Sequence, residues 1–374
     1  MRIGVDAREI QDGVVTGIGR SLANFVYYFG KKEAQHELVL FSEREIHIEF
    51  HGNIKCIEIS ACPTLLWDQW KLPLALKVNS IDLFYSPYYK VPLITGIPIV
   101  NQILDLMFLV FPVYRKQLGI LGRAYYALFG RAFARKSISI ITDSEHAKQD
   151  IVRLWMIDPK KIAVIPLGVG DQYMPVKDTD LLARIRKDLG LPDKYVLYLG
   201  NFKPHKNVES LIGAFRKIAG GFPEYKLVLA GPLDGHGRRI QDLVSKQGLM
   251  GRVVFTGIIR EKDHPEALLS MADLFVFPTL YEGFGLPPLE AMACGTPVIT
   301  SNLTAVPEVI GDAGVMVNPL DVNEMGKAIA DLLQDPEKRV KYSLKGLERS
   351  RIFSEDKTSG RIYWHIITLL EGIE

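Results

Sequence analysis

Two glutamates flank a stiff, glycine-rich turn in the stretch YEGFGLPPLEAMACGTP, which spans residues 281–297. Glu282 and Glu290 are eight positions apart, with two glycines and two prolines between them. A carboxylate only accepts hydrogen bonds, so both side chains suit hydroxyl groups such as those of sugars. The prolines predict a helix start, where unpaired N–H groups and the positive end of the helix dipole attract phosphate. Hydroxyl and phosphate groups together indicate a nucleotide sugar, with one acid for each end of this ligand.

Two other interpretations of this pair stay open at the level of sequence. In the first, Glu290 only complements the dipole of its helix and Glu282 is a solvated loop acid. In the second, the two form the acid pair of a glycosidase, which requires carboxyl groups about 5–9.5 Å apart. Spacing along the chain gives no such distance.

A cluster of basic side chains follows another expected strand, in GNFKPHKN, residues 200–207. Lys203, His205 and Lys206 lie where a helix is expected to begin. Basic groups at a helix start suit a diphosphate. The alternative is a solvated surface run, but the position after a strand of the same half of the chain favours the diphosphate.

The first half of the chain contains a glycine loop before a helix and an acid at a strand end. The loop DGVVTGIGRS, residues 12–21, includes Gly17 but lacks the third glycine of the dinucleotide pattern GxGxxG. It therefore predicts a phosphate or substrate contact only weakly. Asp105 follows an expected strand, where a lone acid can hydrogen-bond a hydroxyl group or, alternatively, cap the next turn.

The segment 113–136 contains six Arg and Lys residues and no Asp or Glu, with apolar and aromatic residues between them. This pattern is typical of an amphipathic basic helix that rests on anionic lipid. The alternative is a core-packed helix with a solvated basic face. No ladder of basic and aromatic residues suggests nucleic-acid readout, so no nucleic-acid partner is expected.

The elements that position these residues alternate along the chain. Short β-branched runs are nearly all apolar, as in parallel strands buried on both faces, and longer amphipathic stretches separate them. This alternation predicts two doubly wound, Rossmann-like α/β domains that face a central cleft, with ligands beyond the carboxyl ends of the strands. We expect an acceptor-binding domain over 1–170, a donor-binding domain over 171–353, and a C-terminal helix over 354–374 that returns to the first domain. Within the second domain, Gly295 is expected to end the short helix that carries Glu290.

The bulk composition limits the class of protein. A chain of 374 residues with 24% charged residues is long enough for two globular domains, and a net charge of +2 draws it to no polyanion as a whole. Three cysteines form no disulfide framework and no paired metal site, which fits a reducing compartment. Charged residues interrupt the N-terminus, so no signal peptide is expected. We expect a cytoplasmic protein that uses no metal.

The motifs resemble those of the retaining glycosyltransferases of family 4, which have the GT-B architecture. EGFGLPPLE is similar to the E-x7-E signature of that family, and TGIGR, GNFKPHKN and PEVIGDAG also match. The chain looks most similar to bacterial mannosyltransferase-like members that build surface or lipid-linked polysaccharides. The resemblance implies hexose transfer, with retention, from a nucleoside-diphosphate sugar to a glycan or lipid-linked glycan. It implies GDP-mannose or a UDP-hexose as donor and no metal or other cofactor. From the cysteine count and the basic segment 113–136 we expect a cytoplasmic enzyme that is peripheral on the inner face of the membrane.

The resemblance also implies roles for single residues. Glu290 should bind ribose hydroxyls of the donor, Glu282 should bind hydroxyls of the transferred sugar, and Lys206 should neutralise the diphosphate. Glu282, Lys206 and Asp105 are the expected catalytic residues. The remaining expected donor-binding residues are Gly283, Phe284, Gly285, Leu286, His205 and Gly17.

The chain departs from the family at two of these positions. His205 stands where many members have arginine. Leu104 stands where the family has the histidine of a His-Asp pair, and Asp105 matches the acid of that pair. A leucine cannot hydrogen-bond a sugar hydroxyl, so a non-catalytic nucleotide-sugar-binding protein stays an alternative. A sugar-nucleotide epimerase of the same architecture is a further alternative.

Overall fold

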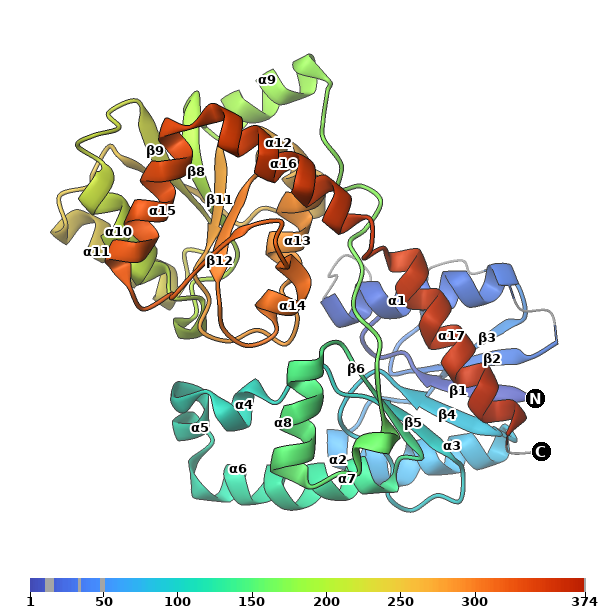
Figure 1. The fold of residues 1–374 in the computed structure, drawn as a ribbon. Coiled ribbons are helices and arrows are strands. Elements are labelled where there is room, and N and C mark those ends of the chain that lie inside the picture. Colours follow the sequence, from blue (N-terminus) through green and yellow to red (C-terminus); the bar gives the residue numbers. More distant parts are fainter. Residues whose placement is uncertain (11–16, 33–34, 48–50, 373–374) are drawn as a thin grey trace. The chain divides into compact units, whose positions relative to one another are not determined.

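The structure of the protein is a computed structural model, which describes residues 1–10, 17–32, 35–47 and 51–372. The chain forms two compact units, each with its own sheet (Figure 1). Unit 1 comprises Met1–Gly168 and Glu355–Glu374, and unit 2 comprises Val169–Ser354. The structural division thus follows Gly168, whereas the sequence-based boundary follows residue 170.

Unit 1 contains a seven-stranded sheet among its described residues, and neighbouring strands in it run parallel. The order is β3-β2-β1-β4-β5-β6-β7, so the direction of strand addition reverses between β1 and β4. Apart from the edge strands β3 and β7, the strands are almost wholly buried, because helices cover both faces. The strands are β1 (Arg2–Asp6), β2 (Glu37–Ser42), β3 (Ile54–Glu58), β4 (Leu83–Ser86), β5 (Ile99–Gln102), β6 (Ser139–Thr142) and β7 (Ile162–Val164).

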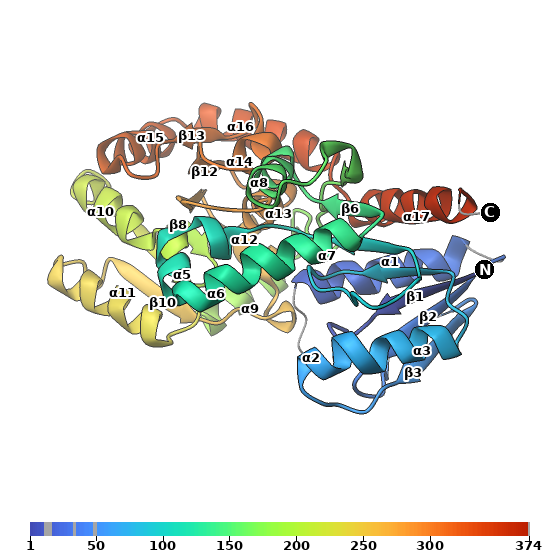
Figure 2. The ribbon, with the colours of Figure 1, turned by 90° about the horizontal axis from the view of Figure 1, so that it is seen from below.

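Different helices cover the two faces of this sheet. α1 (Gly17–Lys32) and α17 (Glu355–Glu371) pack together on one face, over a core that includes β1, β2 and β4. The other face carries the continuous helical segment 64–78 and α7 (Arg131–Lys136), which lie side by side (Figures 1 and 2). Phe133 of α7 joins the same buried cluster as residues of 64–78. α17 is the C-terminal helix that the sequence predicts over 354–374.

The remaining helices of unit 1 lie mostly in the two crossovers on that second face. The segment 64–78 consists of α2 (Thr64–Leu66), the π-helix η1 (Trp67–Lys71) and α3 (Leu72–Val78). The crossover before β6 contains α4 (Met107–Val110), α5 (Pro112–Gln117), α6 (Gly119–Tyr125), the π-helix η2 (Tyr126–Gly130) and α7. α8 (Glu145–Trp155) begins after Ser144, whose hydroxyl accepts a hydrogen bond from the amide of Ala147.

Unit 2 contains a six-stranded parallel sheet among its described residues, in the order β10-β9-β8-β11-β12-β13. The direction of strand addition reverses between β8 and β11. The prediction of two doubly wound parallel α/β domains is therefore confirmed. The strands are β8 (Lys194–Leu199), β9 (Tyr225–Ala230), β10 (Val253–Gly257), β11 (Leu274–Phe277), β12 (Val298–Ser301) and β13 (Val315–Val317).

Two helices of unit 2 were absent from the sequence-based expectations. α9 (Thr179–Asp188) occupies chain next to the expected domain linker, and α16 (Pro336–Ser350) follows α15 (Val322–Gln334) directly. Both are rich in charged residues and have few apolar ones, and each begins after an aspartate whose carboxylate accepts hydrogen bonds from amides of the first turn. The other α-helices of unit 2 are α10 (Val208–Ile218), α11 (Gly235–Lys246), α12 (Pro265–Ser270), α13 (Leu286–Ala293), α14 (Val306–Ile310) and α15.

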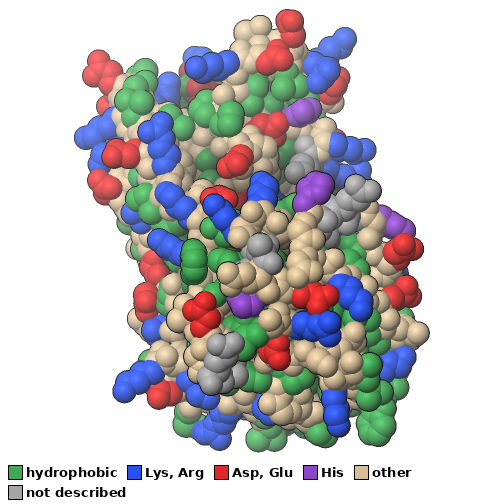
Figure 3. Space-filling model, turned by 90° about the vertical axis from the view of Figure 1, so that its right-hand side faces the viewer, with side chains coloured by type: hydrophobic (Ala, Val, Ile, Leu, Met, Phe, Trp, Pro, Cys, Tyr) green, Lys and Arg blue, Asp and Glu red, His purple; other side chains and the backbone are tan. Residues whose placement is uncertain are grey.

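The surface shows no broad patch of one charge on the face seen in Figure 3, where acidic and basic side chains are interspersed. This agrees with the near-neutral composition. Among the helices described, none combines the length and the apolar character needed to cross a membrane.

We predict that Ile366→Ala, in the buried face of α17, destabilises unit 1 by about 2–5 kcal/mol, because it removes packed side-chain volume from the core shared with α1. Chemical denaturation measures this loss. Trp364→Ala is the control on the same helix, since Trp364 is largely exposed and should cost under about 1 kcal/mol. Equal losses for the two variants would show that α17 does not close this core.

Candidate functional site

The candidate site of unit 2 lies at the carboxyl ends of β8 and β11, where the strand order reverses. Ligands of open α/β sheets bind at such a reversal, because the loops there diverge and leave space. The loop 200–207 follows β8 and the loop 278–285 follows β11, which is hydrogen-bonded to β8. These two loops contain most of the donor-side residues that the sequence predicts.

Lys206 and Glu282 form an ion pair across these loops. The Lys206 Nζ donates to Glu282 Oε1 over 2.6 Å, and the side chains are only 11% and 14% exposed. The same ammonium lies 4.8 Å from the centre of the Phe277 ring, where the ring face attracts a cation. The structure thus brings together two of the predicted site residues, with a cation and a carboxylate in a largely dehydrated setting.

Glu282 is held in place by two threonines. The Thr279 hydroxyl lies 2.8 Å from Glu282 Oε1, and the Glu282 amide donates to Thr304 Oγ1 over 3.1 Å. Thr304 has a left-handed backbone with φ of +58°, which is uncommon for a β-branched residue. Within the described part of the chain, no group donates a hydrogen bond to Glu282 Oε2, so this oxygen can accept one from a ligand hydroxyl.

The loop after Glu282 presents backbone N–H groups. Gly285 has φ of +116° and is the N-cap of α13, which begins at Leu286, earlier than the sequence-based start at Pro287 or Pro288. Those prolines have no N–H, so the first turn of the helix offers fewer donors than its dipole suggests. Among residues that the structure describes, none accepts a hydrogen bond from the amides of Phe284, Gly285 or Leu286.

Glu290 is buried on α13, about one turn beyond these amides. A buried acid in the helix interior lies too far along to serve as a simple N-terminal dipole partner. α13 ends as predicted at Gly295, which has φ of +79°. The amides of Gly295 and Thr296 donate to Met292 and Ala291, which is a Schellman motif. This firm end fixes the short helix that carries Glu290.

The His205 side chain is not the cation that its place in the basic cluster suggests. Its ring is buried, and burial together with the charges of Lys206 and Lys203 lowers its pKa to about 3. The imidazole is therefore neutral near pH 7 and adds no charge to the site. Its backbone carbonyl accepts hydrogen bonds from the Leu280 amide at 2.7 Å and from the Thr279 hydroxyl at 3.1 Å, which joins the two loops.

Asn207 is a positioning residue that the sequence analysis missed. It has φ of +55°, and its side-chain amide donates to Pro278 O at 3.1 Å and to Pro319 O at 2.8 Å. These bonds fix the loop of Lys206 against the loop of Glu282. An asparagine directly before a helix and after a basic cluster was the available signal, because asparagine tolerates the left-handed conformation.

The predicted first-half residues belong to unit 1. Gly17 is the first residue of α1, and residues 11–16 of its loop lie outside the described residues. A Cβ added at Gly17 would meet no described atom within 4 Å, so packing in unit 1 does not require glycine there. The Asp105 carboxylate accepts from the Met107 amide at 2.9 Å and caps α4, which matches the capping alternative for this residue.

Unit 1 has a further charged site at its own strand reversal, between β1 and β4. Burial alone would lower the pKa of Arg8, but hydrogen bonds and charges of Asp6 and Asp68 raise it on balance. The guanidinium also lies 3.8 Å from the centre of the Trp67 ring. After β4, Tyr88 and its neighbours form a partly exposed aromatic group. Asp6 lies only two residues before Arg8, but Asp68 and Trp67 come from the segment 64–78, so the local sequence did not reveal the whole cluster.

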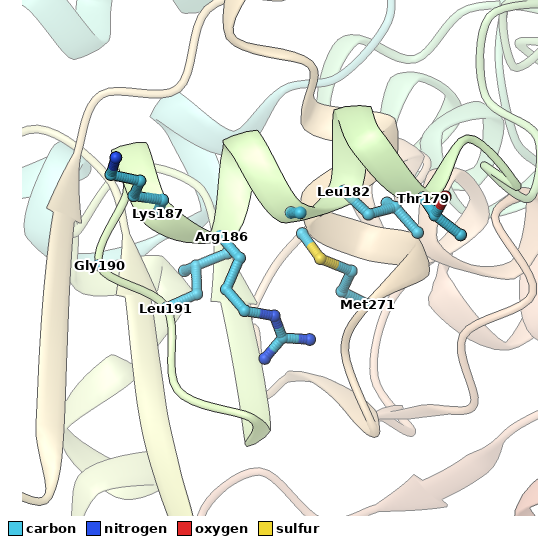
Figure 4. A pocket seen from close by; sticks show the side chains of 8 residues that line it. Thr179, Leu182, Arg186, Lys187, Gly190, Leu191 and Met271 are labelled. Atoms are coloured by element: carbon cyan, nitrogen blue, oxygen red, sulfur yellow. The ribbon is translucent and has the colours of Figure 1, made fainter.

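A separate hollow in unit 2 does not belong to the candidate site. It lies beside α9 and is lined by residues such as Leu182, Arg186, Leu191 and Met271 (Figure 4). Leu191 precedes β8 and Met271 precedes β11, so the hollow is at the amino ends of these strands. The candidate site is at their carboxyl ends. Among the residues that the structure describes, no group of three or more His, Cys, Asp or Glu side chains is placed to hold a metal ion.

The fold is that of GT-B glycosyltransferases. Sucrose-phosphate synthase from Thermosynechococcus elongatus has a TM-score of 0.77 at 22% identity, with 98% of this chain and 99% of that chain covered. Anabaena Alr3699/HepE in complex with UDP and glucose has a TM-score of 0.76 at 17% identity, with 98% and 100% covered. At these identities the likeness concerns the fold alone.

Residues 183–349, which lie within unit 2, match the family model for Glycosyl transferases group 1. O-antigen chain mannosyltransferase B from Escherichia coli is 34% identical over 216 residues, which are 58% of this chain and 56% of that protein. Serotype-specific mannosyltransferase WbdA from Escherichia coli is 34% identical over 201 residues, 53% of this chain and 24% of that protein. The chain thus spans about half of the first relative and about a quarter of the second. The sequence-based resemblance to GT-B glycosyltransferases is confirmed at this level.

We predict that His205 makes the protein less stable as the pH falls from about 6.5 to about 3. In this window the unfolded chain binds a proton on this imidazole and the folded chain does not. The free energy of unfolding should therefore fall by about 1.4 kcal/mol per pH unit from this group. In His205→Asn this slope should be absent, as measured by denaturation at several pH values.

The control for loss of one histidine is His51→Asn, since His51 is exposed in unit 1. An acid slope in His205→Asn as steep as in the unchanged protein would mean that His205 is protonated in the folded state.

Proposed function

We propose that the protein is a retaining glycosyltransferase that transfers a hexose, with mannose favoured, from a nucleoside-diphosphate sugar to a glycan or lipid-linked glycan acceptor. The observation that carries this proposal is the Lys206–Glu282 pair beside three backbone N–H groups at the strand reversal of a Glycosyl transferases group 1 domain. Two relatives are named as an O-antigen chain mannosyltransferase and a serotype-specific mannosyltransferase. These names favour mannose as the transferred sugar and polysaccharide synthesis as the process.

The ion pair suggests how the site meets the donor. Without a donor, Lys206 and Glu282 satisfy each other, so neither charge is left buried and alone. When the donor binds, the ammonium pairs with the diphosphate and Glu282 accepts a hydrogen bond from a hydroxyl of the sugar. The amides of Phe284, Gly285 and Leu286 add donors on the same side. Glu290, buried one turn further along α13, binds the ribose hydroxyls.

In the proposed reaction, the bond between the anomeric carbon and the diphosphate oxygen breaks while the acceptor oxygen bonds the same carbon on the same face. The acceptor's proton passes to the departing diphosphate. Positioning and charge stabilisation are then the work of the protein. The donor is GDP-mannose or a UDP-hexose, and Asp105 and Gly17 of unit 1 are the proposed acceptor-side residues, with Gly17 also approaching the diphosphate.

A non-catalytic nucleotide-sugar-binding protein is the second candidate, because Leu104 replaces a histidine and the Asp105 carboxylate caps α4. Incubation with donor and analysis of products separates the two candidates. Transfer or slow donor hydrolysis supports the enzyme, whereas an unchanged donor supports the binding protein. Conversion of the donor sugar without any acceptor would instead indicate an epimerase.

We also propose that the protein works on the inner face of a membrane, through residues 113–136. The core-packed alternative holds for α7, which buries Phe133 and Ala134. It does not hold for α5 and α6, which bury no residue. Ile120, Leu121 and Leu128 are 77%, 87% and 69% exposed. Apolar side chains so exposed among basic residues suit anionic lipid.

We predict that Lys206→Ala weakens donor binding by about 10-fold to 150-fold, because one charge-assisted hydrogen bond is worth about 1.5–3 kcal/mol. Titration calorimetry with GDP-mannose, UDP-glucose and the free nucleoside diphosphates measures the donor affinity and identifies the nucleobase of the preferred donor. Lys203→Ala is the matched control, a lysine of the same loop with an exposed side chain. Glu290→Ala should weaken binding of the nucleotides, and Glu282→Gln should weaken binding of the sugar nucleotides more than of the free diphosphates.

Unchanged affinity in both Lys206→Ala and Glu290→Ala would place the donor elsewhere. Equal weakening by Lys203→Ala would mean that general charge, not the buried ammonium, attracts the donor.

We predict that Gly17→Val leaves the thermal unfolding midpoint unchanged and weakens transfer about tenfold. The added methyl groups meet no described protein atom but would meet a substrate at this helix start, at a cost of about 1–3 kcal/mol. Initial transfer rates measure the effect. Gly96→Val is the matched control, since a Cβ there also meets nothing within 4 Å and the residue precedes β5. Full activity in Gly17→Val would remove this position from the site.

A further inference from the structure

A second exposed apolar ridge lies on the same face of the unit 1 sheet as α7. Leu66, Trp70, Leu74 and Val78 recur every four residues along 64–78, and all four are exposed. The opposite side of this segment buries Trp67, Leu72 and Leu76 in the core. The segment therefore has a full inner face and, in addition, an outer apolar face that no described residue covers.

The four-residue repeat is supported by the local helix geometry. An α-helix has 3.6 residues per turn, so a strict four-residue stripe would drift around it. The π-helix η1, which runs over Trp67–Lys71, adds a wider turn in the middle of the segment and keeps Leu66, Trp70 and Leu74 closer to one line. The segment presents the largest of these side chains, Trp70, at 70% exposure.

The charges around this ridge are positive. Lys77 is exposed and Lys71 partly so, whereas Asp68, the one acid of 64–78, is buried and bonded to Arg8. The neighbouring crossover has no Asp or Glu anywhere from 106 to 142. An anionic partner is therefore favoured over a neutral or positive one.

The ridge and the exposed residues of α6 and η2 belong to one layer. Phe133 of α7, which continues directly from η2, packs into the same cluster as Trp67 and Leu76. Figures 1 and 2 show α3 and α7 running side by side under the sheet. Ile94, also exposed, lines a hollow together with Pro73 and Lys77 of α3 and extends this apolar layer.

We propose that Leu66, Trp70, Leu74 and Val78 insert into the headgroup region of an anionic bilayer and form, with the exposed face of α6 and η2, one two-ridged membrane-binding surface. A tryptophan at the centre of such a ridge suits the interface, because its ring is apolar and its N–H is polar. This inference rests on the proposed membrane contact of 113–136 but not on glycosyl transfer. Two ridges on one rigid layer would fix the orientation of unit 1 on the surface, which a single helix cannot do.

The test is co-sedimentation of the full chain with vesicles of equal parts phosphatidylcholine and phosphatidylglycerol, and with vesicles of phosphatidylcholine alone. The unchanged protein should bind the anionic vesicles. Trp70→Ser/Leu74→Ser should lower the partition coefficient at least about tenfold, because two large apolar side chains no longer leave water. Trp364→Ser is the matched control, since Trp364 is 62% exposed but lies on α17, over the other face.

A second measurement avoids any dependence on the folding of the double variant. Of the four tryptophans, Trp67 and Trp155 are fully buried, so Trp364→Phe leaves Trp70 as the one exposed reporter. Vesicles that contain brominated phosphatidylglycerol should quench the fluorescence of Trp70. High salt should abolish this quenching, because it screens the attraction to the anionic lipid.

The outcomes separate this inference from the proposal for 113–136. Binding lost in Ile120→Ser/Leu121→Ser but unchanged in Trp70→Ser/Leu74→Ser, without quenching of Trp70, would overturn the second ridge alone. No binding by the unchanged protein would overturn both. A dimer in sedimentation velocity that Trp70→Ser/Leu74→Ser converts to a monomer would mean that a second copy of the chain covers the ridge, which also overturns the inference.

Discussion

The site depends on one interaction, the ion pair between Lys206 and Glu282 at the strand reversal of unit 2. Each charge would be costly if it were buried alone, and their contact at 2.6 Å removes that cost while leaving both side chains slightly exposed. The pair can open to admit a ligand. Glu282 Oε1 contacts Lys206 and Thr279, so exchange with a charged ligand requires only that these partners shift. A diphosphate that takes the place of the carboxylate pairs with the ammonium, and the Glu282 carboxylate then keeps hydrogen bonds from Thr279 and from a sugar hydroxyl in place of its cation.

The hydrogen bonds around the pair hold the loops 200–207 and 278–285 in a fixed position relative to each other. Asn207 bonds carbonyls on both sides, the His205 carbonyl accepts from the Leu280 amide, and Thr304 accepts from the Glu282 amide. The backbone of Thr304 costs free energy, because a positive φ is strained for a β-branched residue, whereas Asn207 and Gly285 are of types that adopt positive φ readily. Such conformations persist only where the surroundings determine them, and they gather here beside the pair. The neutral His205 ring also favours this arrangement, because a protonated imidazole would repel the Lys206 ammonium.

Unit 1 uses its apolar residues differently on its two faces. On one face, α17 returns from the far end of the chain and packs with α1, so that the core there is closed. On the other face, the helical segments 64–78 and 107–136 bury one side and leave large apolar side chains exposed on the other. Such exposure on two neighbouring segments without exposed acids is a feature of surfaces that meet a partner. The face under α1 and α17 therefore has a structural role, and the opposite face is suited to bind a partner.

The sequence by itself determined the architecture of the two sheets, and it predicts the donor-side groups, which stay a prediction. The two parallel sheets agree with the alternation of short apolar runs and amphipathic stretches, because the inner strands of a parallel sheet are buried on both faces, and the Gly295 helix end follows from the conformational freedom of glycine. It could not determine α9 or α16, whose charged sequences become helical through caps and packing. Only the tertiary structure decided that Lys206 meets Glu282, that His205 is neutral, and that Asp105 caps α4. The reason is the same in each case: pairing, burial and pKa depend on neighbours that are remote in the chain, and spacing along the chain contains no distance in space.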